Sequence, residues 1–546
     1  MKMDSNHIYI TAPHSERNTI KEKLNGVWSK RHNAWRFPKS TIALDEIAAF
    51  IPQLTSTIAW QDIYTKLSQG RQKLKQLKRT EHQQEPSDKL RPYQRQDVNY
   101  LSKIPSAGIF NQQRTGKTPT TIETIKARGA KRNIIICPAS LQHNWKKEIN
   151  QWHSDAQAYL YAGTPTARAE QLKRFNETEH NAAYLIVSKD TAKRNVEQLT
   201  NGNAYDVCVV DEAHYLRNSD TKQSEAVHQI GYQSDHRYAL TGTPTVKHPA
   251  DIFGILKFLY PHKFTSYWQF VERYFNVEDN GWGKVLGGPK THRIAELQDL
   301  IDAMSTQRLR KDVMQWLPDK TRHTHLCKMD KAQQKLYKSM LDDFFIKAGD
   351  TELDAQNVLA QLTRLRQICL DPRTIGLDTP SAKTESLLEA IEDGTYAENG
   401  QPIIIMSMFT SYLKLLEPEL KKIGKRVGTI HGQMTNKEKD DAAQAFQRGE
   451  IDILLCNIIS AGTGFTLDKG EVIIFTDKAW NPSDNEQAED RITPTQTNRN
   501  HKHFIVSLVC EDTVDERINK LLENKKSLTS IINECKTAND LRKWFF

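Results

Sequence analysis

Two series of short apolar segments, each followed by a polar, helix-forming stretch, constrain the fold of this 546-residue chain more than any other feature. The first series reads NIIICP at 133–138, AYLIVS at 183–188, DVCVVDEAH at 206–214 and RYALTGTP at 237–244. The second begins near residue 402 and reads PIIIMS, RVGTIHG, DILLCN, EVIIFTD and KHFIVSLV. Short apolar runs that alternate with helical segments predict buried parallel strands joined by crossover helices. We therefore expect an α/β fold with two doubly wound sheets and ligands outside the carboxyl ends of the strands.

Charge and hydropathy exclude several classes of protein. Lys and Arg number 76 against 67 Asp and Glu, a net charge of +9, which fits a localised basic groove but does not identify a nucleic-acid partner. No apolar run approaches the roughly 18 residues of a membrane span, and the start MKMDSNHIYI lacks a signal-peptide core. We expect a cytoplasmic protein, without a membrane partner, from a bacterial cell or a virus-infected host cell.

The seven cysteines, none in C-x-x-C spacing, predict neither a structural zinc site nor a disulfide framework. Cys137, Cys208 and Cys456 lie in or beside apolar runs, where we expect buried thiols that pack as small hydrophobic groups. Such a set is typical of a reducing compartment.

The segments outside the two series differ in character. HIYITA predicts a strand, TIKEKLNGV a helix that stops at a glycine, and WSKRHNAWRFP a turn or strand, so the first 55 residues form a small α+β unit. The basic run RQKLKQLKR at 71–79 predicts a solvated helix or charged linker, with contact to a phosphate backbone as the alternative. Residues 246–375 favour helices and are rich in aromatics. The expected parts are 1–55, the linker 56–88, a lobe at 89–320 and a lobe at 321–546, both lobes with helical insertions.

The strongest local motif is Gly116-Lys117-Thr118, which follows the strand-like AGIFNQQRT and precedes the helical PTTIETIKA. Backbone N–H groups at such a helix start cradle phosphate oxygens. Lys117 would supply charge to the β- and γ-phosphates, and Thr118 would supply a hydroxyl to Mg²⁺. The full pattern G-x-x-x-x-G-K-T needs glycine at position 111, where this chain has Asn111.

A second motif, DEAH, places Asp211 and Glu212 at the end of a buried strand, where ionised carboxylates are costly without a cation. Mg²⁺ held by Asp211, with Glu212 orienting the attacking water, is a physical reason for this placement. An acidic helix cap is the simpler alternative. It does not explain the order of GKT, DEAH and Thr241-Gly242-Thr243 along the chain, which indicates ATP binding and hydrolysis.

Taken together, the motifs resemble those of superfamily two helicases, specifically the switch/sucrose-non-fermenting (Snf) type of double-stranded DNA translocase. The resemblance runs from Leu90 to about Lys526 and includes LRPYQRQDVNYL, QQRTGKT, CPASLQHNWKKEINQW, DEAHYLRN and LTGTP. TQRLRKDVMQWLPDKT and LTRLRQICLDP are its most family-specific stretches, and TIHGQM, ISAGTGFTL, TDKAWNPSDNEQAEDR and EDTVDERI follow in the second lobe. It implies two RecA-like lobes, with ATP and Mg²⁺ as cofactors.

The resemblance also implies roles for individual residues. Gln487 and Arg491 would cross the lobe interface towards the ATP phosphates, with Arg491 stabilising transition-state charge. For Arg491, the alternative is a surface ion pair with Glu489 or Asp490. For Trp480, which the resemblance places beside DNA, the alternative is core packing. The residues implied to bind ATP are Gln94, Arg114, Thr115, Gly116, Lys117, Thr118, Gly464 and Arg491. The motor residues implied to contact DNA are Pro138, Ser140, Thr241, Gly462 and Trp480.

Two positions depart from the family pattern. Pro494 replaces the second arginine of the motif that begins at Arg491, so either Arg491 acts alone, another cation such as Arg499 substitutes, or hydrolysis is slowed. Arg114 stands where the family commonly has glycine; a long cation suits neighbouring phosphates but leaves the loop conformation open. Because Lys117, Asp211 and Glu212 remain, we predict an active ATPase.

Near the N-terminus, GVWSKRHNAWRFPKS at 26–40 resembles the HARP-type module of annealing helicases and fork-remodelling translocases. Trp28, Trp35, Phe37 and Pro38 match its pattern, and cations, among them Arg31 and Arg36, are interleaved. Aromatics with interleaved cations can stack on exposed bases and neutralise phosphates, so DNA contacts are expected from Trp28, Arg31, Trp35 and Arg36. A small hydrophobic core is the alternative use of the aromatics.

From these motifs we expect an ATP-dependent DNA translocase or helicase that acts in DNA replication, recombination or repair. Its expected substrates are forked or four-way-junction DNA, remodelled by fork regression and branch migration with limited unwinding, and we expect a monomer. One alternative is a superfamily two RNA or single-strand helicase. Another is a DNA-binding scaffold with a degenerate ATPase site.

Overall fold

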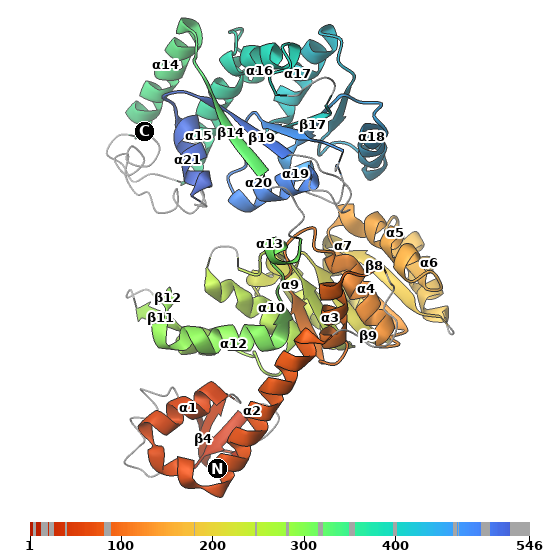
Figure 1. Cartoon of the computed structure of the whole chain (residues 1–546), viewed down its shortest axis with the longest axis vertical. Coiled ribbons are helices and arrows are strands. Elements are labelled where there is room, and N and C mark those ends of the chain that lie inside the picture. Colours follow the sequence, from red (N-terminus) through yellow and green to blue (C-terminus); the bar gives the residue numbers. More distant parts are fainter. Residues whose placement is uncertain are drawn as a thin grey trace. The chain divides into compact units, whose positions relative to one another are not determined.

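The computed structural model (Figure 1) describes residues 1–3, 7–12, 20, 27–38, 41–80, 89–178, 181–245, 248–279, 283–314, 320–348, 355–396, 401–461, 467, 469–492 and 503–524. The chain divides into two compact units, Met1–Val313 and Met314–Phe546, each with its own central parallel sheet. The predicted pair of doubly wound α/β lobes is therefore confirmed.

The first unit begins with a small module built on a four-stranded antiparallel sheet of order β1-β2-β4-β3. Its strands are β1 (Lys2–Met3), β2 (His7–Ile10), β3 (Val27–Ser29) and β4 (Ala34–Pro38), and its helices are α1 (Thr41–Phe50) and the first turns of α2 (Ile58–Arg79). The strand predicted at HIYITA and the strand-and-turn predicted at WSKRHNAWRFP are confirmed. The helix predicted at TIKEKLNGV lies almost wholly outside the described residues.

The first lobe is a seven-stranded sheet of order β13-β5-β10-β9-β6-β8-β7, with every described pairing parallel. The strands are β5 (Ser106–Ile109), β6 (Arg132–Cys137), β7 (Gln157–Tyr161), β8 (Ala183–Ser188), β9 (Tyr205–Asp211), β10 (Ser234–Leu240) and β13 (Ser305–Thr306). The helices are α3 (Pro92–Leu101), α4 (Lys117–Ala127), α5 (Gln142–Trp152), α6 (Pro165–Glu177), α7 (Lys189–Arg194), α8 (Val196–Thr200), α9 (Lys222–Tyr232), α10 (Ile252–Leu259), α11 (Tyr267–Tyr274), α12 (Ile294–Met304) and α13 (Arg310–Val313).

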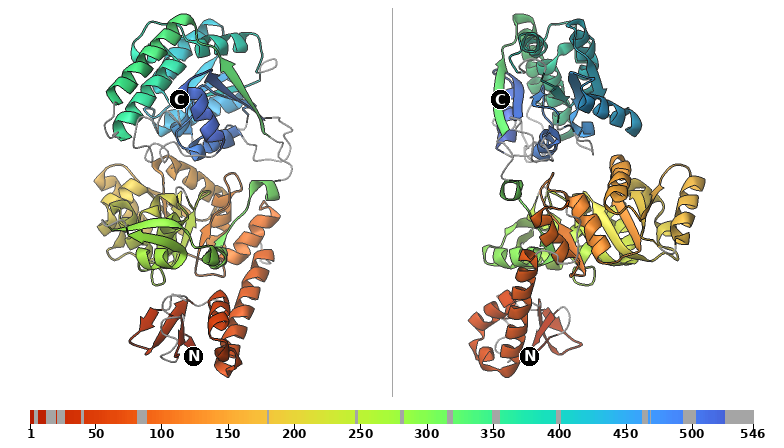
Figure 2. Two further views of the ribbon diagram at one scale, coloured as in Figure 1. Left: turned by 90° about the vertical axis from the view of Figure 1, so that its left-hand side faces the viewer. Right: turned by 45° about the vertical axis from the view of Figure 1, so that its right-hand side comes forward.

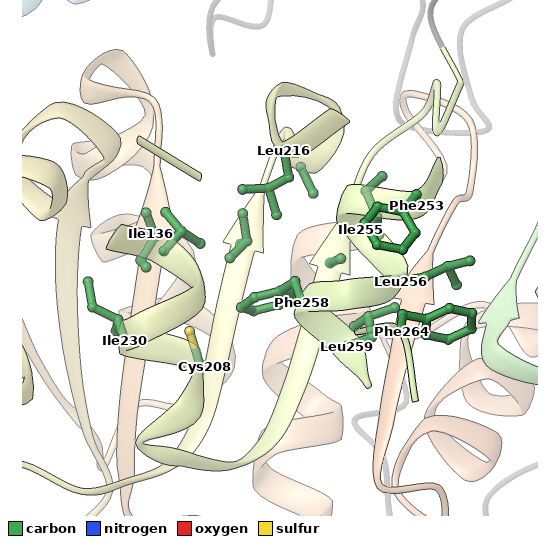
Figure 3. Close-up of a cluster of buried hydrophobic side chains, with 14 of the residues drawn as sticks. Ile136, Cys208, Leu216, Ile230, Phe253, Ile255, Leu256, Phe258, Leu259 and Phe264 are labelled. Atoms are coloured by element: carbon green, nitrogen blue, oxygen red, sulfur yellow. The ribbon is translucent and has the colours of Figure 1, made fainter. Parts of the chain in front are cut away.

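Helices cover both faces of this sheet (Figure 2), because its strands are apolar on both sides. Successive residues of β6 alternate between two hydrophobic clusters: Ile134 and Ile136 pack on one face, Ile135 and Cys137 on the other. Figure 3 shows the first cluster, to which α10 contributes Phe253 and Phe258 and β9 contributes Cys208. The burial predicted for Cys137, Cys208 and Cys456 is confirmed.

Within the helical insertion of this lobe, a two-stranded antiparallel hairpin forms from β11 (Phe275–Asp279) and β12 (Lys284–Pro289). After α12 the chain returns to the sheet edge, where β13 pairs with β5. The backbone N–H of Phe110 donates to the carbonyl of Thr306 at 2.9 Å, which places the family-specific TQRLRK segment beside the loop that follows β5.

The second unit holds a six-stranded parallel sheet of order β14-β19-β18-β15-β17-β16. Its strands are β14 (Lys320–Cys327), β15 (Ile403–Ser407), β16 (Val427–Ile430), β17 (Ile453–Asn457), β18 (Val472–Phe475) and β19 (His503–Cys510). Its helices are α14 (Lys331–Ala348), α15 (Ala355–Leu370), α16 (Ala382–Glu392), α17 (Thr410–Lys422), α18 (Asn436–Arg448), α19 (Ile458–Ala461), α20 (Pro482–Glu489) and α21 (Val514–Glu523).

None of the described helices combines the length and apolar character that crossing a bilayer requires. Within the described ranges there is also no cluster of three or more His, Cys, Asp or Glu side chains suited to a metal ion.

Candidate functional site

The register of the first sheet brings the three motifs of the first lobe to one edge. Leu240, the last residue of β10, lies opposite Ile109 of β5 on one side and Asp211 of β9 on the other. The loops that follow these three residues carry GKT, DEAH and TGT. The motifs that are far apart in sequence therefore meet at the carboxyl edge of the sheet, as predicted for a ligand site.

The phosphate-loop motif lies between β5 and α4. Gly116 caps α4 with φ +78°, and a Cβ atom there would lie 2.1 Å from Nε2 of Gln94, so only glycine fits. The backbone of Arg114 also adopts a left-handed conformation, with φ +65°. A non-glycine residue at that angle carries backbone strain, which explains why glycine is common at this position in the family that the sequence resembles.

Gln94 of α3, which the resemblance assigns to ATP, is buried against this loop. Its Nε2 donates to the carbonyl of Thr115 at 3.2 Å, and its Oε1 accepts from the backbone N–H of Arg91 at 2.8 Å. The neighbouring Tyr93 hydroxyl donates to the same Thr115 carbonyl at 2.8 Å. Gln94 thus holds the loop through the Thr115 carbonyl, and its contact with ATP stays a prediction.

Lys117 and Thr118 open α4 at the mouth of the loop. The Lys117 ammonium donates to the carbonyl of Asn111 at 3.1 Å, so its charge lies over the loop backbone. Three other threonines of α4, Thr120, Thr121 and Thr124, use their hydroxyls to bond carbonyls four residues earlier. The Thr118 hydroxyl has no such bond to the described residues, and a hydroxyl in this position suits a metal ion or a phosphate.

Asp211 ends β9 as a buried carboxylate, 8% exposed. Its Oδ2 accepts from the indole Nε1 of Trp145 at 2.9 Å, and its Oδ1 from the backbone N–H of Glu212 at 2.9 Å. Burial and the adjacent Glu212 charge raise the pKa of Asp211 to about 6, although Trp145 and Lys117 act in the opposite direction. A divalent cation would relieve this excess of negative charge.

The DEAH and TGT motifs are joined through His214. Its Nδ1 lies 3.3 Å from the carboxylate of Glu212 and 3.3 Å from the hydroxyl of Thr241. The Thr241 hydroxyl also accepts from the backbone N–H of Thr243 at 3.1 Å. Thr241 is completely buried and its hydroxyl serves the link between the motifs, while the DNA contact expected of it stays a prediction.

A buried ion pair, which the motif pattern did not predict, supports the phosphate loop. Oδ1 of Asp97 on α3 accepts from the Nη2 of Arg308 at 2.8 Å, and Oδ2 accepts from Nδ2 of Asn111 at 2.8 Å. Asp97 is 1% exposed. The backbone of Gln112 also donates to the carbonyl of Arg308 at 3.0 Å. The TQRLRK segment therefore contacts the loop directly, which gives that stretch a physical role.

Pro138 and Ser140, predicted to contact DNA, follow β6 at the same carboxyl edge of the sheet. Both are half-buried and lie at the 3-10 turn Ala139–Leu141, which leads into α5. Trp145, the partner of Asp211, lies on α5 itself. The segment expected to meet the DNA backbone is thus connected to the Asp211 carboxylate through the first turn of α5 and the hydrogen bond of Trp145.

In the second unit, Gln487 lies on α20 and Arg491 in the 3-10 turn Asp490–Ile492 that follows it. The acidic residues before Arg491 are bound by cations of β14. The Nζ of Lys320 lies 2.8 Å from Oδ1 of Asp490 and 3.3 Å from Oε2 of Glu489. Arg322 lies 2.5 Å from the same Glu489 oxygen. The DKT end of the family-specific segment therefore neutralises the acidic pair beside Arg491.

The other residues assigned to the second unit have different surroundings. Trp480 is half-buried on a hydrophobic cluster, and the guanidinium of Arg366 lies 4.7 Å from its ring centroid. This packing matches the alternative considered for Trp480 from sequence. Gly462, Gly464, Pro494 and Arg499 lie outside the described residues.

In the N-terminal module the two tryptophans differ in exposure. Trp28 on β3 is 46% exposed, whereas Trp35 on β4 is 7% exposed and belongs to the core with Ile8 and Phe37. Their rings meet edge to face, 5.3 Å apart. Arg31 in the turn is exposed and Arg36 is half-buried. Trp35 thus packs in the module's core, the alternative use considered for the aromatics from sequence, and its contact with DNA stays a prediction.

These geometries define a two-lobed α/β protein whose first lobe has a phosphate-loop motif, an acidic strand end and a motif that joins them. The SNF2-related domain matches residues 61–374, more than half of the chain, and the helicase conserved C-terminal domain matches residues 382–493. The chain belongs to the SNF2-related family of superfamily two. Members of this family use ATP with Mg²⁺, and the Lys117, Thr118 and Asp211 groups described above fit these cofactors.

Two curated relatives and one solved structure illustrate the similarity. YwqA of Bacillus subtilis, named as an ATP-dependent helicase/translocase, is 28% identical over 83% of this chain and 50% of its own. The mouse SWI/SNF-related matrix-associated actin-dependent regulator of chromatin subfamily A member 1 is 25% identical over 81% of this chain and 43% of its own. The chain thus spans half or less of the length of these relatives. The Sulfolobus solfataricus SWI2/SNF2 ATPase core in complex with double-stranded DNA is 23% identical over 84% of this chain and 97% of its own, with a TM-score of 0.38.

Proposed function

We propose that this SNF2-family ATP-dependent helicase/translocase couples ATP hydrolysis to movement along DNA and remodels forked or four-way-junction substrates. The observation that carries the motor part of the proposal is the linked set of motifs in the first lobe. Lys117 lies on the loop, Asp211 faces it from β9, and His214 connects Glu212 to Thr241. The acidic pair, the cation and the coupling threonine are all present, which argues against a degenerate ATPase site.

In this proposal different residues of the chain bind phosphate, hold Mg²⁺ and orient the attacking water. Lys117 and the N–H groups at the start of α4 bind phosphate, while Thr118 and Asp211 would hold Mg²⁺, which neutralises charge on the transferring phosphate. Glu212 orients the attacking water, and Arg491 of the second unit supplies a cation to the transition state. The Trp145 and His214 contacts transmit changes at the DNA-facing loops to these groups.

The branched-DNA part of the proposal rests on the N-terminal module. Trp28 is a large aromatic that the fold leaves exposed beside the exposed Arg31. An aromatic with neighbouring cations suits an unpaired base at a junction, because the ring stacks while the cations neutralise phosphates. The aromatic surface of a purely structural module would be inside, as that of Trp35 is.

ATP hydrolysis should be measured with linear duplex, forked DNA, four-way junctions, single strands and RNA, together with strand exchange on the branched substrates. We expect stimulation by duplex-containing DNA, with strand exchange on forks and junctions. A Lys117→Ala variant should lose both activities. Stimulation by RNA alone would favour an RNA helicase, and equal background hydrolysis by the wild type and Lys117→Ala would favour a scaffold.

A Trp28→Ala variant tests the substrate preference. We expect the advantage of junctions over linear duplex to fall several-fold, while duplex-stimulated ATP hydrolysis is retained. Arg168→Ala, which alters an arginine of the first lobe away from the module, is the control. An unchanged junction preference in Trp28→Ala would refute the role of the module.

A further inference from the structure

One helix of the first unit, α2, belongs to two hydrophobic cores. Trp60 and Ile63 of its first turns are buried in the core of the N-terminal module, and Leu67 packs against the same cluster. Leu74 and Leu77, two and three turns later, pack against the cluster on one face of the first lobe's sheet. The segment predicted as a solvated helix or charged linker is therefore a helix, and its inner side is packed rather than solvated.

Polar contacts fix the second half of α2 on the lobe. Arg71 pairs with Asp299 of α12 at 2.5 Å, and Lys78 donates to the carbonyl of Asp302. Nδ2 of Asn99 on α3 donates to the carbonyls of Leu77 at 3.1 Å and Thr80 at 2.9 Å. The cations on the inner side of the helix are thus used in docking, and the helix has a defined rotation about its axis.

The exposed surface of α2 carries four further cations, Lys66, Lys73, Lys75 and Arg79, which we call the α2 ridge. At roughly 100° per residue, Lys66 and Lys73 lie on one flank of this surface and Lys75 and Arg79 on the other. All four are exposed, and none has an ion-pair partner among the described residues. The sequence contains no Asp or Glu from residue 63 to residue 80. At about 1.5 Å per residue, Lys66 and Arg79 lie about 20 Å apart along the helix. The helix dipole accounts for a cation at Arg79 but not for Lys66, Lys73 or Lys75.

The remaining outer residues indicate what kind of partner this surface suits. Gln69, Gln72 and Gln76 are exposed between the cations. Protein interfaces depend on buried aromatic or aliphatic anchors, and the outer side between Lys66 and Arg79 offers none. Cations on both flanks, with amide donors between them, match a sugar–phosphate backbone, which is contacted through charge and hydrogen bonds rather than through apolar pockets.

We propose that the α2 ridge binds the phosphate backbone of duplex DNA that extends from the motor towards the N-terminal module. This proposal rests on the proposed function, because it takes DNA as the substrate. The ridge supplies affinity without sequence specificity, and docking of α2 holds the helix that carries its cations in a fixed position, which lowers the entropy lost on binding.

The test compares K66Q/K73Q/K75Q/R79Q in the full chain with a control, K131Q/K173Q/K421Q/K422Q, that removes four exposed lysines elsewhere. Affinity for a four-way junction and for linear duplex is measured at several KCl concentrations without nucleotide. Each lost phosphate contact lowers the slope of log K against log salt by roughly 0.9, so the ridge variant should lose roughly 3 to 4 from that slope. The control should keep the wild-type slope.

Three results would overturn the proposal: an unchanged slope in the ridge variant, an equal loss in ridge and control variants, or wild-type affinity at every salt concentration. Absence of DNA binding by the wild type would instead refute the proposed function. If the fourfold variant loses helix content, the pairs K66Q/K73Q and K75Q/R79Q replace it, and each should lose about half of the change. Hydrolysis of ATP without DNA should be the same in all variants.

Discussion

The indole Nε1 of Trp145 donates a hydrogen bond to Oδ2 of Asp211, across 2.9 Å in the interior of the first lobe. Trp145 is 1% exposed and is packed on all sides, so the N–H has a fixed direction. A hydrogen bond to a buried carboxylate stabilises its charged form, the form that binds a metal ion. The bond also joins α5, which follows the segment expected to meet DNA, to the predicted Mg²⁺ ligand.

Trp145→Phe removes this donor but keeps an aromatic ring. A hydrogen bond to a charged group contributes roughly 1.5–3 kcal/mol, so we expect kcat for ATP to fall at least about tenfold, with a higher Mg²⁺ requirement. Trp152→Phe is a matched control on the same helix, since its Nε1 bonds the half-buried Glu148 at 3.0 Å. Equal kinetics for the two variants would show that the Trp145 bond is only structural.

Arg308→Gln should destabilise the first unit by roughly 3–5 kcal/mol, because it leaves the buried Asp97 carboxylate without its cation. Asp97→Asn in the same chain removes that charge, so the double variant should regain most of the stability and of the nucleotide affinity. Urea unfolding and nucleotide titration provide the measurements. Equal destabilisation of the single and double variants would exclude the unpaired charge as the cause.

Lys320→Gln is expected to lower kcat with little change in KM, because it leaves Asp490, next to Arg491, without this cation while Arg322 still binds Glu489. Lys320→Arg should retain activity. Arg426→Gln breaks an exposed ion pair with Asp452 in the same unit and serves as the control. If Lys320 acts by positioning Arg491, its effect should largely vanish in an Arg491→Ala background. Additive losses would contradict that role.

His228 predicts an acid-sensitive first unit. Burial lowers the pKa of His228 to about 4, while its ring bonds the carbonyl of Gly254. The unfolded chain, with a pKa near 6.5, binds the proton more strongly than the folded chain. Stability is therefore complete above about pH 7 and falls as the pH drops towards 4, by up to about 3 kcal/mol. His228→Gln should flatten this part of a pH series of urea unfolding curves, and an unchanged series would refute the assignment.

Arg114→Gly tests the position in the phosphate loop where this chain has arginine and the family commonly has glycine. Glycine removes the strain of a side chain at φ +65°, so we expect the nucleotide-free protein to gain roughly 1 kcal/mol in unfolding free energy. We also expect weaker binding of nucleotide, because a cation beside the phosphates is lost. Calorimetric unfolding and a nucleotide titration measure the two effects. Tighter binding by the glycine variant would show that Arg114 obstructs the loop.

Sequence pattern was sufficient for the elements buried on both faces. The apolar runs of β6, β8 and β9 are buried on both faces, and with the apolar end of β10 they predicted both the sheet and the edge at which the motifs meet. The strands β7 and β14 were not predicted. Both lie at sheet edges, and β14 is mostly exposed, so no run of apolar residues marks it.

Long-range side-chain contacts were the part of the site that sequence could not supply. Asp97 and Arg308 are 211 residues apart, and nothing in either local sequence names the other as its partner. The inward-facing hydroxyl of Thr241 illustrates the same limit. A motif match assigns a residue to a site, but only the fold shows whether its side chain points out to a ligand or inward to a neighbouring motif.

The packing of α2 has a consequence for how this protein can be divided, by experimenters or by evolution. A chain shortened to begin near residue 86 would lose Leu74 and Leu77, together with the Lys78 side chain that lies 4.9 Å from the ring centroid of Tyr100. A cut before Trp60 would instead leave the module's own core open. Any recombination breakpoint along the helix exposes apolar surface on one side, so the module and the motor lobe are expected to be inherited together. Deletion would confound loss of substrate recognition with loss of stability, and only substitutions on the surface can separate the two.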